Sequence, residues 1–242
     1  MKQTTAKKSP FLILELAFFL ALTLPPIVHS VATGILQENE GTVAAIMSPD
    51  LLSTALQGML AIAMLARSRM LPADISRQED GVGGWLARIS GRLSAALAAA
   101  GLLLANSLLW DRLSRLGGGT PVPGDGGLLD GGGAILLVAT TATAAFYEEV
   151  LYRWYGPRLL KALFPSPPRR KGPATGMPVF RWTEFALLAA FAIAHGYGGW
   201  PAVGNALVAG ILLRSCALLT ASPLPGFLAH LAYNLVQLSL LL

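Results

Sequence analysis

Charged residues are scarce in this sequence, and their scarcity decides its class. Only 13% of the 242 residues are Asp, Glu, Lys or Arg, while 54% are hydrophobic. Soluble globular domains carry about 25% charged residues. The apolar excess falls in blocks that are long enough to cross a bilayer. The composition therefore excludes an ordinary soluble domain and predicts a polytopic membrane protein.

Cysteine and metal-binding motifs are also scarce. Cys216 is the only cysteine and lies in an apolar run, which excludes a disulfide framework and a thiolate metal cluster. No His-Glu-x-x-His helix is present. The glycine-rich stretch Gly117–Gly133 lacks the Lys-Ser/Thr ending of a phosphate-binding loop, so we interpret it as an external loop.

The fold predicted from the apolar blocks is an all-α transmembrane helical bundle with about seven spans. The expected spans are Phe11–Ser30, Leu51–Ala66, Leu93–Trp110, Ala134–Arg153, Trp182–Tyr197, Pro201–Leu219 and Leu224–Leu242. The first could instead be a cleaved signal peptide, because lysines precede it and small residues follow at Ser30–Ala32. We favour a retained helix.

Basic residues between the spans predict the orientation. Lys and Arg cluster before span one, between spans two and three, and from Arg153 through the proline-rich linker Pro165–Pro178 to Arg181. Arg214 lies near the connection from span six to span seven, and the opposite side receives only Arg112 and Arg115. The positive-inside rule then places the N-terminus in the cytoplasm. Topology explains the net charge of +5, so we expect no nucleic-acid partner.

Ionisable side chains inside spans are costly and mark functional sites. Glu148 and Glu149 are neighbours in span four, and adjacent helical residues point about 100° apart. Arg153 follows Glu149 by four residues, which favours an ion pair on one helix face. We predict that Glu149 pairs with Arg153 and that Glu148 faces a different group.

Two further spans carry polar residues at the same spacing. His230 and Asn234 share a face of span seven, and Phe191 places a ring beside His195 in span five. By helical rise His195 lies about 21 Å from the start of its span. It reaches the depth of Glu148 only if span four continues to Leu163 or span five tilts. Convergence of these groups on one buried pocket is the central structural prediction.

Three motifs together resemble a known family. Glu148-Glu149-Val-Leu-Tyr-Arg153, Phe191-Ala-Ile-Ala-His195 and His230-Leu-Ala-Tyr-Asn234 stand in the order and placement of the CAAX protease and bacteriocin-processing family. That family includes the type II CAAX prenyl endopeptidases. The chain differs at Trp154, where family members often carry glycine. We accordingly divide the chain into an N-terminal membrane region, residues 1–131, and a catalytic core, residues 132–242.

The resemblance implies an intramembrane glutamic endopeptidase in the inner (plasma) membrane of a bacterium. Glu148 would be the general base assisted by His195, His230 and Asn234 would stabilise the oxyanion, and Glu149 and Arg153 would support the site. The partners implied are the lipid bilayer and a membrane-anchored protein or peptide: a prenylated CAAX-like tail, a bacteriocin precursor or a C-terminal sorting segment.

We expect no cofactor, and the alternative is a zinc ion held by His195, His230 and a glutamate. Two other functions stay open: a non-catalytic immunity or scaffold protein, and a transporter that uses these residues as a proton relay.

Overall fold

The computed structural model describes residues 10–32, 51–71, 82–116, 131–165 and 182–241, and these residues form helices without a strand. The elements are α1 (Pro10–Ser30), α3 (Leu51–Ser68), α4 (Val82–Leu116), α5 (Gly131–Glu148), the π-helix η2 (Glu149–Tyr155), α6 (Gly156–Leu163), α7 (Trp182–Ala194), the 3-10 turn η3 (Gly196–Gly198), α8 (Gly199–Thr220) and α9 (Leu224–Leu241).

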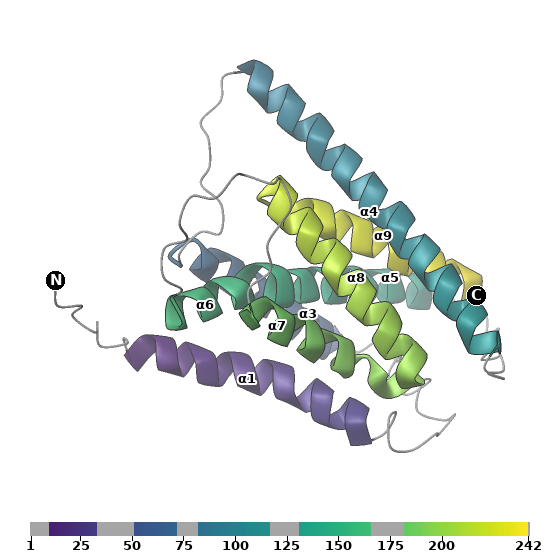
Figure 1. Cartoon of the computed structure of the whole chain (residues 1–242), viewed down its shortest axis with the longest axis horizontal. Helices are drawn as coiled ribbons and strands as arrows, with labels where there is room; N and C mark the ends of the chain where they lie inside the picture. The colour runs from purple at the N-terminus through teal and green to yellow at the C-terminus, as the bar shows by residue number, and fades with distance from the viewer. Residues whose placement is uncertain (1–9, 33–50, 72–81, 117–130, 166–181, 242) are drawn as a thin grey trace.

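The continuous rod α5–η2–α6 forms the centre of the bundle. α3 packs along α5 and η2, and α1 packs along α7 and α6. On the other side α4 lies against α8 and α9, while α9 also contacts α5 (Figure 1). The central rod is therefore enclosed by helices from both ends of the chain, so that residues far apart in sequence meet beside it.

The predicted spans correspond to helical segments, with corrected boundaries. Among the described residues, five helices are long and apolar enough to cross a membrane, and α7 is a shorter apolar helix. The fourth span does not end at Arg153 but continues to Leu163, and it starts within the loop predicted at Gly117–Gly133. The remainder of that loop, and all but the first residue of the linker predicted at Pro165–Pro178, lie outside the described residues.

The third and fifth spans also differ from their predicted bounds. α4 extends well beyond Leu93–Trp110 at both ends, because its flanks contain leucine, alanine and arginine, which favour helix. α7 ends at Ala194 rather than Tyr197, since glycines at 196, 198 and 199 interrupt the helix. Gly199 adopts a φ of 75°, a conformation that glycine reaches without steric cost.

The outer surface of the bundle is apolar and its interior contains small residues. Leu14, Leu97 and Ile135 are among the exposed large side chains, which is typical of a surface solvated by lipid. A Cβ atom at Gly204 of α8 would lie 2.2 Å from the Trp110 ring of α4, so glycine permits this close helix contact. Cys216 is a free, buried thiol.

Ion pairs with buried carboxylates join the helices. Glu15 of α1 pairs with Arg67 of α3, and Glu184 of α7 pairs with Arg214 of α8. Arg214 is 2% exposed, so it is a core residue and not the loop charge that the sequence predicted. Arg153 and Arg158 are buried as well. Because these three arginines are buried between helices, they do not count as loop charges for the positive-inside rule. The cytoplasmic N-terminus stays a prediction from the remaining basic residues.

Replacing Arg214 with leucine should lower the free energy of unfolding by about 3–5 kcal/mol, because it leaves the Glu184 carboxylate buried without its cation. The measurement is unfolding of the purified protein in detergent. Arg115→Leu is the matched control, since it removes an exposed pair with Asp111 and should cost at most about 1 kcal/mol. Equal losses in the two variants would contradict this assignment.

Candidate active site

The site begins where the central rod changes its winding. Glu148 is the last residue of α5, and Glu149 opens η2, in which hydrogen bonds run to the fifth residue. The Gly156 N–H donates to the Leu151 carbonyl at the end of this segment. A Cβ atom at Gly156 would lie 2.7 Å from that oxygen, so the segment requires glycine there. Short π-helical insertions of this kind occur often at functional sites.

Pro157 follows and has no N–H with which to bond the Arg153 carbonyl four residues earlier. Arg214 Nη1 of α8 donates to that carbonyl at 2.8 Å. The Glu184–Arg214 pair therefore stabilises the backbone of η2 from outside the rod. The sequence analysis missed this role because it treated Arg214 as a topological charge.

Glu149 and Arg153 form the ion pair that their spacing predicts. Arg153 Nη1 lies 3.2 Å from Glu149 Oε1, and the two side chains are 2% and 0% exposed. Gly226 of α9 approaches the same carboxylate so closely that an added Cβ would lie 2.9 Å from Glu149 Oε2. α9 can reach Glu149 only because it carries glycine at this position.

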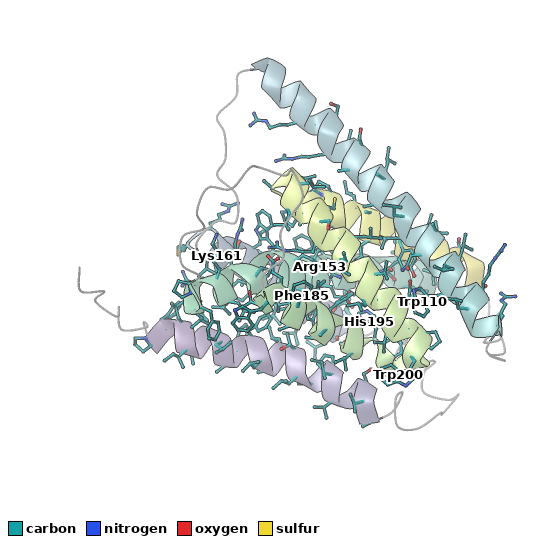
Figure 2. All side chains as sticks on the ribbon, viewed as in Figure 1. Trp110, Arg153, Lys161, Phe185, His195 and Trp200 are labelled. Carbon is teal, nitrogen blue, oxygen red and sulfur yellow. The ribbon has the colours of Figure 1, made fainter. Side chains whose placement is uncertain are left out.

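Phe191 connects this pair to His195. The Arg153 guanidinium lies over the Phe191 ring, with Cζ 3.8 Å from the ring centroid, and the His195 ring lies 4.4 Å from the same centroid. His195 Nδ1 is 2.8 Å from the Phe191 carbonyl oxygen. A carbonyl only accepts, so Nδ1 carries the hydrogen and Nε2 of the neutral ring has a free lone pair. Arg153 and His195 lie among the side chains in the interior (Figure 2).

His230 of α9 contacts both glutamates. Its Nδ1 lies 3.1 Å from Glu149 Oε1, and its Nε2 lies 3.8 Å from Glu148 Oε2. Because the Arg153-paired carboxylate only accepts hydrogen bonds, His230 donates through Nδ1. The ring is thereby oriented with Nε2 towards Glu148.

The predicted catalytic residues line one cavity of about 440 Å³: Glu148, His195, His230 and Asn234. This volume lies in the range of small-ligand sites. Phe191 also lines the cavity, whereas Glu149 and Arg153 do not. The Glu148 side chain is 25% exposed and the Glu149 side chain 0%. The two adjacent glutamates thus occupy different environments, one facing the cavity and one in a buried ion pair.

The cavity has polar walls that the motifs did not indicate. Besides the motif residues it is lined by further hydrogen-bonding side chains: Thr140, Thr141, Tyr197, Asn205, Tyr233 and Gln237. The sequence could have indicated Asn205, since an amide in an apolar span is costly to bury, which is the criterion that selected Asn234.

Trp154 stands at the position where family members often carry glycine. Its ring stacks on Arg158, with the Arg158 Cζ atom 3.6 Å from the ring centroid.

A metal centre would need three or more ligands at one point. Within the described part of the chain, no group of three His, Cys, Asp or Glu side chains is arranged to hold an ion. Phe191 and Glu149 already engage Nδ1 of His195 and His230, respectively. These contacts leave Nε2 of both rings facing the cavity, and a hydrogen bond at Nδ1 is equally typical of a zinc-bound histidine, so the choice between the metal-free and the zinc reading is made by experiment.

Gly226→Ala should destabilise the protein, because the added methyl group meets the Glu149 carboxylate and separates α9 from the ion pair. We expect a lower unfolding midpoint in detergent and loss of any activity that depends on the cavity. Gly101→Ala is the control: its Cβ meets nothing within 4 Å in helix α4, so this change should be neutral or stabilise by up to about 1 kcal/mol. An unchanged midpoint for Gly226→Ala would show that the close contact does not matter.

Comparison with known proteins gives a match for the segment that carries the three motifs. Residues 131–236 match the family model described as Type II CAAX prenyl endopeptidase Rce1-like. No curated protein and no solved structure matches the chain. The matched residues contain all three motifs and every predicted site residue. Residues 131–236 are therefore similar to the Rce1-like type II CAAX prenyl endopeptidases.

Proposed function

We propose that the protein is an intramembrane glutamic endopeptidase that hydrolyses a peptide bond of a membrane-associated protein or peptide. The observation that carries the proposal is the common cavity of Glu148, His195, His230 and Asn234, which come from three separate segments of the chain. A base beside hydrogen-bond donors is what hydrolysis of a peptide bond requires. The family match supports a membrane-embedded peptidase.

In the proposed mechanism Glu148 removes a proton from a water molecule, and the water oxygen attacks the scissile carbonyl carbon. His195, whose Nδ1 is held by the Phe191 carbonyl, helps to orient that water through Nε2. As the carbon–nitrogen bond breaks, Glu148 returns the proton to the leaving amine. These two steps consume only water and the peptide bond, and the proton taken by Glu148 leaves with the amine.

Negative charge develops on the carbonyl oxygen during attack, and we assign its stabilisation to His230 and Asn234. His230 would donate through Nε2, because its Nδ1 is occupied by Glu149. This role requires a hydrogen on each ring nitrogen, with Nδ1 directed to Glu149 and Nε2 on the side of Glu148. Glu149 and Arg153 act indirectly, by holding His230 and Phe191 in place.

Residues 132–242 would carry this chemistry, with residues 1–131 as their support in the membrane. α3 and α4 contact α5, α8 and α9, so they brace the helices that supply the cavity. With the N-terminus in the cytoplasm, the Leu163 end of the rod would lie towards the cytoplasmic side of a bacterial inner membrane, with Glu148 near the middle of the rod. A reporter fused to each terminus would test that orientation.

Glu148→Gln should abolish cleavage, with a loss of about 10²–10⁴-fold in kcat, while the unfolding midpoint stays unchanged. Glu149→Gln is the matched comparison: it breaks a fully buried ion pair and should lower the midpoint as well as the activity. Purified protein in liposomes would be assayed with internally quenched CAAX-type peptides, with and without a farnesyl group. Peptide profiles of membranes with and without the active protein would reveal a natural product.

Other outcomes separate the rival functions. A scaffold would keep its cellular effect in Glu148→Gln, and a proton-coupled transporter would show uptake that depends on a pH gradient. Either result, with no peptide cleaved by the wild-type protein, would refute the proposal.

We also propose that catalysis needs no resident metal ion. Cleavage should then persist in strong chelators after dialysis, with less than one equivalent of zinc in the purified protein. Activity that is lost in chelator and restored by zinc alone would establish the zinc alternative.

A further inference from the structure

A chain of side-chain hydrogen bonds runs from α4 through α8 to α9 and ends at the cavity. Asn106 Nδ2 of α4 donates to Asn205 Oδ1 of α8 at 2.6 Å, and Asn205 Nδ2 donates to the Tyr233 hydroxyl of α9 at 3.1 Å. Asn205 and Tyr233 both line the cavity. Asn205 lies outside the three motifs and Tyr233 is an unspecified position of His-x-x-x-Asn, so the proposed mechanism does not use this relay.

The direction of the relay is fixed by a backbone group. Asn106 Nδ2 also lies 3.1 Å from the backbone carbonyl oxygen of Asn205. A carbonyl oxygen only accepts, so the Asn106 atom at this point is the amide nitrogen. Its second partner at 2.6 Å must then be the acceptor oxygen of the Asn205 side chain. Asn205 is left with its NH₂ group facing Tyr233.

The relay therefore determines where the Tyr233 hydrogen points. The phenol oxygen accepts from Asn205 Nδ2, so its own hydrogen is directed away from Asn205. Within the part of the chain that the structure describes, no acceptor contacts this hydroxyl. We infer that Tyr233 donates its O–H to a peptide carbonyl of the substrate, next to the bond that the Glu148-activated water hydrolyses. This inference rests on the proposed function and adds a substrate-contacting residue to it.

The neighbourhood of Tyr233 suits a peptide better than a hydrocarbon chain. Gln237 follows Tyr233 by one helical turn on the same wall of the cavity, and its Nε2 donates to Ser107 Oγ at 2.5 Å. The two residues are separated by a rise of about 6 Å along α9. Peptide groups two residues apart in an extended chain are about 6.6 Å apart. This wall can therefore contact alternate peptide groups of one extended segment.

Conservative variants test the inference. Tyr233→Phe should reduce kcat/KM for the quenched CAAX-type peptide by about 2- to 15-fold, the effect of one hydrogen bond, mainly through KM. Asn205→Asp should cause a comparable loss, because its carboxylate accepts the phenol hydrogen and withdraws it from the substrate. In Asn205→Asp/Tyr233→Phe the two losses should not add. Tyr155→Phe, a buried tyrosine outside the cavity, is the matched control and should leave kcat/KM unchanged.

Binding separates this inference from the proposed function. In the Glu148→Gln background, Tyr233→Phe should weaken binding of a fluorescent version of the same peptide by a similar factor. If the wild-type protein cleaves no peptide but Tyr233→Phe still weakens binding, the proposed function fails and the Tyr233 contact stands. Unchanged binding and cleavage in Tyr233→Phe would overturn the contact. The contact would also be overturned if binding and cleavage fell only in proportion to a lower unfolding midpoint, because Tyr233 would then have a structural role.

Discussion

The Glu149 carboxylate is the point on which the arrangement of the site depends. One of its oxygens lies 3.2 Å from Arg153 and 3.1 Å from His230, and α9 reaches it only because residue 226 is glycine. A buried charge is stable only when it is paired and hydrogen-bonded. The carboxylate therefore requires both partners at once, and this requirement joins the central rod to α9 through His230.

The constraint extends through the guanidinium of Arg153. The guanidinium lies against the Phe191 ring, which also contacts His195, and the Phe191 carbonyl accepts from His195 Nδ1. A single ion pair thus orients one histidine directly and the other through an aromatic ring. Arg214 supports the same turn from α8 by donating to the Arg153 carbonyl. The two cavity histidines are thus positioned by the Glu149–Arg153 ion pair, although neither member of the pair lines the cavity.

Adjacent residues on one rod occupy different environments because neighbouring helical residues point about 100° apart, and the winding also changes between them. Glu148 ends an α-helix and faces the cavity, while Glu149 begins a π-helix and turns into the core. A water-filled space in the membrane needs polar walls, and here α4, α8 and α9 provide them through the Asn106–Asn205–Tyr233 relay. Asn205 and Tyr233, which the sequence analysis did not select, are part of the cavity wall.

The sequence by itself determined the membrane class, the helical spans, the Glu149–Arg153 pair and the set of residues that meet in the cavity. These follow from composition and from spacing along one helix, which are local properties. Only the tertiary structure decided that span four continues to Leu163, that Arg214 is buried, and that His230 contacts both glutamates. The same holds for the direction of the Tyr233 relay. Each depends on contacts between helices, and residue spacing within one helix contains no information about its neighbours.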